Sequence, residues 1–114
     1  MKKLLVCLDG SKKETDVLEA AIALARRTGA RMTLFRSVGM PSELPAAAYS
    51  MAVDDVPALL QRQAEAALAV LAKTVPAELY AGSRVSVGNP WPSIERAAAE
   101  EDVDLIVVGS HGYH

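Results

Sequence analysis

Two short segments carry the residues whose types could bind a ligand. The first is Leu8-Asp9-Gly10-Ser11 and the second is Gly109-Ser110-His111-Gly112, and each follows an apolar run. Glycines in the second segment would let backbone N–H groups face a phosphate, because no Cβ stands in the way. The Asp9 carboxylate could accept a hydrogen bond from a ribose hydroxyl or an adenine amino group, or hold a metal ion. Simpler interpretations stay open, since Gly-x-x-Gly also makes ordinary tight turns and Asp-Gly is a common turn pair.

Other combinations of reactive residues are weaker. His111 and His114 could share a metal ion, but no acidic or sulfur side chain stands beside them in the sequence. Cys7 lies in an apolar run without a neighbouring charge, which favours a small buried side chain over a nucleophile. Trp91 lies between two prolines, and we expect it to pack over the sheet edge or against a partner. The sequence contains no Walker A loop and no His-Glu-x-x-His pattern.

Four predicted strands position these segments. The apolar runs 3–8 and 104–108 are typical of strands buried on both faces, so we expect them side by side in the middle of a sheet. Residues 31–38 predict a second strand. Residues 84–87 alternate between polar and apolar, which predicts a third strand that begins near residue 78 and lies at the sheet edge.

Three helices are predicted between the strands. Ser11-Lys12-Lys13-Glu14 matches a capping box, and Gly29 is placed to end the first helix near residue 28. A second helix begins at Asp55, after a loop of about 15 residues, and ends before Pro76. A short third helix follows the turn-rich segment 88–93.

The order of these elements predicts an α/β fold, with an open parallel sheet and helices on both faces. Placing the two most apolar strands together gives the strand order 3-2-1-4. The chain then reverses direction between strands one and four. Ligands of such sheets bind outside the carboxyl ends of the strands at that point. The predicted pocket therefore combines the two segments described first.

Composition limits the class of protein. The chain of 114 residues fits a single domain, 1–114, and with 51% hydrophobic and 23% charged residues it can fill a core. The net charge is −2, and no basic stripe is present, so nucleic acid is not an expected partner. The apolar runs are far shorter than the roughly 20 residues that span a bilayer, so no membrane partner is expected. A single cysteine and a start without a signal-peptide core favour the cytoplasm.

The motifs LLVCLDGS, ALARRTGA and MTLFRSV, followed by VSVGNPWPSIERAAAEEDVDLIVVGSHG, span nearly the whole chain. On these residues, and above all on DLIVVGSHG, the chain resembles the universal stress protein family. The resemblance implies a Rossmann-like layered α/β domain. In a subset of that family it implies ATP bound through Gly-x-x-Gly, a spacer, and then Gly-Ser or Gly-Thr. Gly109 and Gly112 match the leading glycines, but the sequence stops before the second pair and the family's fifth strand, so we expect an incomplete domain.

Carried over position by position, the resemblance implies where a nucleotide would lie. The implied site residues are Cys7, Leu8, Asp9, Ser37, Val38, Val108, Gly109, His111 and Gly112. The first five would contact adenine and ribose, and the amides of the strand-four turn would contact the phosphates. Mg²⁺ would accompany a triphosphate, with Asp9 as the nearby carboxylate. Because no Lys or Arg is placed to stabilise charge on a γ-phosphate, we expect a binding switch with at most slow ATPase activity.

Two alternatives remain open. One is a nucleotide-free interaction module that works through dimerisation, as another branch of the resembled family does. The other is an enzyme of the wider adenine-nucleotide hydrolase group, although the loop after the first strand is poor in the glycine that such enzymes need there. The fourth strand would have an unpaired edge if no strand follows it, so we expect a homodimer or a swapped assembly.

Overall fold

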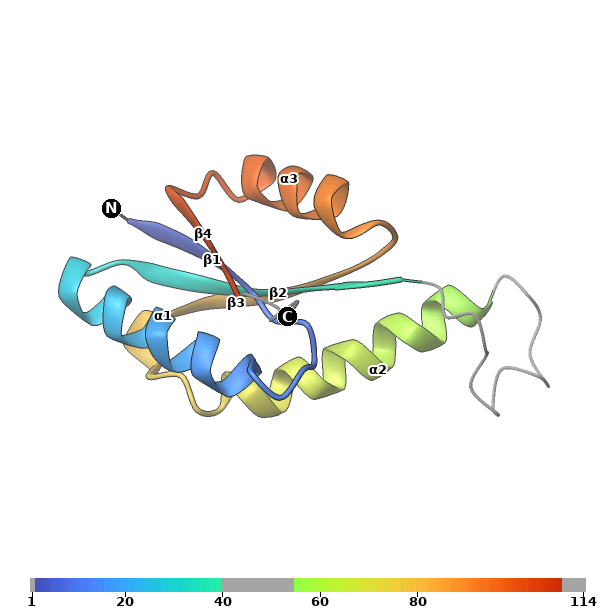
Figure 1. Ribbon diagram of the computed structural model, residues 1–114, viewed down its shortest axis with the longest axis horizontal. Coiled ribbons are helices and arrows are strands. Elements are labelled where there is room, and N and C mark those ends of the chain that lie inside the picture. The colour runs from blue at the N-terminus through green and yellow to red at the C-terminus, as the bar shows by residue number, and fades with distance from the viewer. Residues whose placement is uncertain (1, 40–54, 110–114) are drawn as a thin grey trace, which may run out of the picture.

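The computed structural model describes residues 2–39 and 55–109 and forms a four-stranded sheet with helices on both faces (Figure 1). The elements, in chain order, are β1 (Lys3–Cys7), α1 (Glu14–Thr28), β2 (Arg31–Val38), α2 (Asp55–Ala72), the short 3₁₀ turn η2 (Ala77–Leu79), β3 (Tyr80–Val87), α3 (Pro90–Glu100) and β4 (Leu105–Val108). Helices α1 and α2 cover one face and α3 covers the other. The predicted alternation of strands and helices is confirmed. The loop expected before α2 lies outside the described residues.

All strand pairs are parallel, and the order is β3-β2-β1-β4, as predicted. Strand β1 lies between two neighbours, and its residues Leu4, Leu5 and Val6 are fully buried. Cys7 at its end pairs with Phe35 of β2 on one side and with Val108 of β4 on the other. The carboxyl ends of three strands therefore meet at one edge of the sheet.

Strand β4 is less buried than its composition predicts. Leu105, Ile106 and Val108 are 38%, 37% and 48% exposed. The expectation of a strand buried on both sides is wrong for β4, because within the described residues no strand pairs with its outer edge. The expectation of a buried strand is confirmed for its neighbour β1, whose residues Leu4, Leu5 and Val6 are fully buried. At the opposite end of the sheet, β3 has the edge position that its alternating pattern predicted.

Two apolar clusters hold the helices to the sheet. The larger one joins α1 and α2 to the face of the sheet that carries Leu4, Val6 and Leu34. The smaller one joins α3 to the other face through Leu5 and Phe35. This division follows from the strand period of two, which sends successive side chains to opposite faces. It explains why consecutive residues are buried and apolar in Leu4–Val6 of β1 and at Leu34 and Phe35 of β2.

The helix ends agree with the sequence signals in part. Helix α1 ends at Gly29, which has a left-handed φ of 74° and donates its N–H to the Ala25 carbonyl over 2.8 Å. Helix α3 begins at Pro90, within the segment 88–93 that the sequence predicts as a turn. A proline is tolerated at this position, because the N–H that it lacks would have no partner in the first helical turn. Among the described helices, none is long and apolar enough to cross a membrane.

Asp104, just before β4, fastens the amino end of β1. Its Oδ2 accepts the backbone N–H groups of Lys2 and Lys3 over 2.7 and 2.9 Å. These two hydrogen bonds lower the pKa of the Asp104 carboxyl below 3.8. A carboxylate with a lowered pKa in the folded state stabilises that state at higher pH, and the contribution is lost as the pH falls through the folded-state value.

We expect Asp104→Asn to unfold at a lower denaturant concentration than the wild type at pH 7, because the charged acceptor is lost. The gap should shrink as the pH falls below 4, where the wild-type carboxyl takes up its proton. Urea titrations at several pH values measure this. Glu19→Gln, on an exposed position of α1, is the control. A gap that stays constant from pH 7 to pH 2 would contradict the role given to the Asp104 charge.

Candidate functional site

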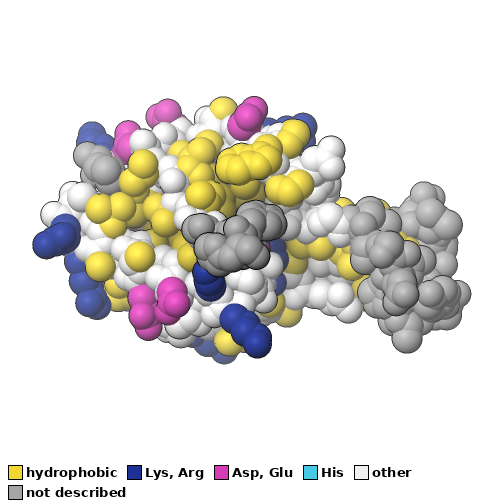
Figure 2. All heavy atoms as spheres, viewed as in Figure 1, with side chains coloured by type: hydrophobic (Ala, Val, Ile, Leu, Met, Phe, Trp, Pro, Cys, Tyr) yellow, Lys and Arg dark blue, Asp and Glu magenta, His cyan; other side chains and the backbone are white. Residues whose placement is uncertain are grey.

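A hollow of about 330 Å³ lies at the carboxyl ends of β1, β2 and β4, against the first turns of α3. We call it the strand-end hollow. Its lining consists of Cys7, Leu8, Asp9, Phe35, Ser37, Pro90, Trp91, Ile94, Val108 and Gly109. Figure 2 shows hydrophobic side chains gathered over α3 on the same side of the molecule. The hollow lies where the reversal of chain direction between strands one and four predicted a pocket.

Most of the implied site residues meet there. Cys7, Leu8, Asp9, Ser37, Val108 and Gly109 all line the strand-end hollow. Val38 instead lines an adjoining hollow of about 380 Å³ between the end of β2 and α2, which shares Asp9 and Ser37 with the first. His111 and Gly112 lie outside the described residues.

The sequence analysis missed the apolar wall. Phe35 comes from β2, and Pro90, Trp91 and Ile94 come from α3. Two signals could have found them. Phe35 and Ser37 are two residues apart on one strand and so share a face, while Trp91 and Ile94 are three apart on one helix and so lie on the same side. Trp91, for which the sequence predicts packing over the sheet edge or against a partner, lines the hollow.

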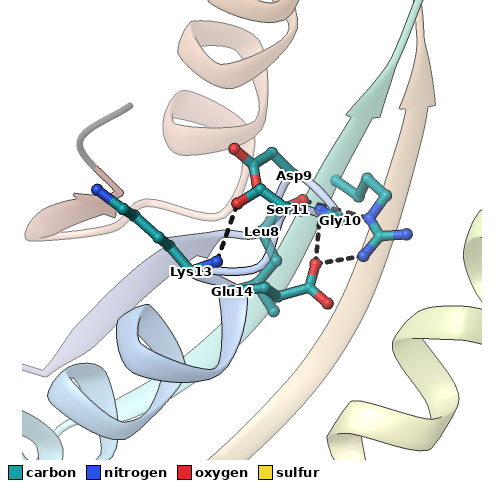
Figure 3. Close-up of polar contacts among 7 residues, drawn as sticks. Leu8, Asp9, Gly10, Ser11, Lys13 and Glu14 are labelled. Carbon is teal, nitrogen blue, oxygen red and sulfur yellow. Dashed lines mark hydrogen bonds and ion pairs between the residues drawn. The ribbon is translucent and has the colours of Figure 1, made fainter. Parts of the chain in front are cut away.

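The turn after β1 is built from local hydrogen bonds (Figure 3). Asp9 Oδ1 accepts the Ser11 N–H over 2.9 Å, and Ser11 Oγ accepts the Lys13 N–H over 3.3 Å. Glu14 Oε2 accepts the N–H of Gly10 over 2.7 Å, not that of Ser11. The predicted capping box is therefore wrong in detail. The Ser11 N–H, which Glu14 would accept in a capping box, already donates to Asp9. Glu14 therefore accepts the N–H of the preceding residue, Gly10.

Arg36 ties this turn to β2. Its Nε donates to the Leu8 carbonyl over 3.3 Å, and its guanidinium forms an ion pair with Glu14. Both side chains are largely buried, at 13% and 15% exposure. Removing one member of a buried pair leaves an uncompensated charge, so each holds the other in place. The Arg36 charge is thus already matched by a carboxylate of the protein.

Gly109 has a packing reason to be glycine. A Cβ built at this position would lie 2.7 Å from Cγ2 of Val17 on α1, closer than real side chains approach. The branched Val17 side chain has little freedom to move away. The close approach of the end of β4 to α1 therefore requires glycine here, whether or not a phosphate binds. A substitution at Gly109 would test packing and ligand binding at once.

Cys7 lines the hollow with a thiol whose charged form is disfavoured. Burial raises the pKa of its thiol from 9.0 to about 11, because the thiolate would lose its hydration. Within residues 2–39 and 55–109, no three His, Cys, Asp or Glu side chains are grouped so that they could hold a metal ion. What the hollow offers is thus an apolar enclosure with one carboxylate, Asp9, and the hydroxyl of Ser37 at its rim.

The family comparison decides what kind of protein has this arrangement. The model of the universal stress protein family matches residues 1–114. The chain belongs to the universal stress protein family. The resemblance seen in the sequence motifs is confirmed. Comparison with the curated proteins gives no significant match.

Solved structures share the fold of this universal stress protein. UspA from Lactobacillus plantarum is 24% identical, with a TM-score of 0.71 over 99% of this chain and 81% of that one. A universal stress protein from Burkholderia pseudomallei is 29% identical, with a TM-score of 0.64 over 96% and 82% of the two chains. A universal stress protein in complex with cAMP is 23% identical, with a TM-score of 0.58 over 98% and 74%.

The raised pKa of Cys7 predicts slow alkylation. A pKa of about 11 in place of 9.0 reduces the thiolate fraction at pH 8 by about 100-fold, and only the thiolate attacks iodoacetamide. We expect the folded protein to react about 100-fold more slowly than the same chain unfolded in guanidinium chloride, measured by mass spectrometry. Equal rates in the two states would show that the Cys7 environment does not disfavour its charge.

Proposed function

We propose that this universal stress protein is a cytoplasmic stress-response protein that binds an adenine nucleotide, ATP foremost, in the strand-end hollow. The observation that carries the proposal is the meeting of an apolar enclosure and the Asp9 carboxylate at the ends of β1, β2 and β4. In this proposal the 114 residues act as one domain. The single cysteine, which can form no disulfide within the chain, fits a reducing compartment.

The hollow suits the base and the sugar. Its volume of about 330 Å³ is within the range of small-molecule sites, and its apolar lining includes Cys7, Phe35 and Ile94. A flat aromatic base would bury one face against these side chains. Asp9 would accept hydrogen bonds from the ribose hydroxyls, while Leu8, Ser37 and Val38 would border the base and sugar. That a universal stress protein of similar fold has been solved with cAMP supports a nucleotide as the class of ligand.

The phosphates would lie beyond the end of β4. In the proposal they contact the amides of Val108, Gly109 and Gly112, with His111 in the same turn. Mg²⁺ would bind through phosphate oxygens and water, with Asp9 as the one carboxylate in the described lining of the hollow. No Lys or Arg is among the described residues that line the strand-end hollow. Nearby, Arg36 is paired with Glu14, and Lys13 lines a small adjoining hollow with Asp9 and Gly109. Because no cation of the described lining faces the hollow itself, the protein in this proposal acts as a binding switch with slow hydrolysis at most.

The direct test is to denature the purified protein, identify any released nucleotide by chromatography, and titrate ATP into the refolded protein by calorimetry. We expect Asp9→Asn to weaken ATP binding by about 10- to 100-fold, because it replaces a charged acceptor worth about 1.5–3 kcal/mol. The amide oxygen can still accept the Ser11 N–H, so the turn should persist. ATP affinity equal to wild type in Asp9→Asn would exclude the Asp9 role.

A pair of matched variants tests the place of binding. Val108→Phe adds bulk at a 48% exposed position that lines the hollow, and Val70→Phe adds the same bulk at a 64% exposed position on α2. Blocking the hollow should abolish the calorimetric signal in the first variant and leave it intact in the second. Loss in both, or in neither, would place ATP elsewhere.

A second candidate function is a nucleotide-free dimeric interaction module, and the exposed apolar side chains of β4 favour it. An edge strand with unpaired backbone groups can pair with the same strand of another copy. We expect a homodimer at micromolar concentration in sedimentation velocity, and a shift to monomer in Ile106→Lys, because a charge would be buried at the joint. A monomeric wild type would rule out the dimer. A dimer that binds no nucleotide would favour this module over the nucleotide switch.

A further inference from the structure

Two aromatic side chains, Phe35 and Trp91, line the strand-end hollow. The sequence contains one Trp and one Phe, and both line the strand-end hollow. Phe35 is fully buried, so its burial alone accounts for its presence in the core. Trp91 is 62% exposed. An indole left at the rim of a cavity keeps a large apolar face in water, and the core does not explain it.

Trp91 is held at the rim by a stiff backbone. It lies in the first turn of α3 between Pro90 and Pro92, whose rings fix their own φ angles near about −65°. Only the two side-chain torsions of the indole remain to be ordered when a ligand arrives. Ile94, one helical turn further on, is 7% exposed and packs in one cluster with Leu5 and Phe35, which fixes α3 against the sheet. The indole is therefore placed beside the hollow at low entropic cost.

We propose that Trp91 is a specificity-determining residue of the strand-end hollow, where its indole stacks on the exposed face of a purine base. This inference rests on the proposed function, since it needs a nucleotide in the hollow. Base-aromatic stacking changes affinity by about 5- to 150-fold when the aromatic residue is replaced by Ala. The bicyclic purine covers more of the indole than a single pyrimidine ring does. Trp91 thus favours ATP over UTP in addition to strengthening binding.

The test uses three forms of the whole chain and two nucleotides. Affinities for ATP and UTP are measured by calorimetry for the wild type, Trp91→Ala and Trp91→Phe. We expect Trp91→Ala to weaken ATP binding at least 5-fold, to weaken UTP binding less, and so to narrow the preference for ATP. Trp91→Phe keeps an aromatic face and should recover part of the loss. Since Trp91 is largely exposed, neither variant should change the urea midpoint by much, which a denaturation curve checks.

Fluorescence gives an independent measurement, because Trp91 is the single tryptophan. ATP should change its emission and protect it from acrylamide quenching, with a midpoint equal to the calorimetric dissociation constant. If ATP binds the wild type but Trp91→Ala binds it equally well, and the emission stays constant, the stacking role is overturned while the proposed function stands. If ATP does not bind the wild type at all, both are overturned.

Discussion

The pairing of β1 with a parallel neighbour on each side is the constraint from which the rest of the structure follows. Leu4, Leu5 and Val6 are fully buried there, and the register brings Cys7 level with Phe35 and with Val108. Parallel strands must all end at the same edge of the sheet, so three chain segments far apart in sequence finish together. The strand-end hollow is a consequence of that meeting, and a slip of register by one residue would turn Cys7 and Asp9 to the other face.

The tip of β1 is fixed by charge as well as by pairing. Arg36 reaches from β2 to the Leu8 carbonyl and to Glu14, and Glu14 also accepts the Gly10 N–H. The bound carboxylate and guanidinium hold the turn that presents Asp9, but they neutralise each other. The ion pair thus has a structural role in this turn, since it holds the segment that carries Asp9 at the end of β1. Among the described residues, no Lys or Arg lines the strand-end hollow itself.

Much of this arrangement could be predicted from the sequence, because it depends on local patterns. Apolar runs that end in turn signals predict the strands. The continuous apolar run of the first strand and the alternating pattern of the third predict a central and an edge position in the sheet. What failed depended on how the elements lie in the sheet and on competition between neighbouring hydrogen-bond acceptors. The exposure of Leu105 and Ile106 follows from the place of β4 at the edge of the described sheet. The shifted bond of Glu14 follows from competition by Asp9. The wall formed by Trp91 and Ile94 depends on how α3 crosses the sheet, which no local period encodes.

The hollow exists because side chains become smaller toward the carboxyl edge on the α3 face. Along β1 this face carries Leu5 and then Cys7, and along β2 it carries Phe35 and then Ser37. The first turns of α3 lie over the small side chains Cys7 and Ser37, and the space between them is the strand-end hollow. A sequence that kept Leu or Phe at both end positions would preserve the fold and fill the hollow.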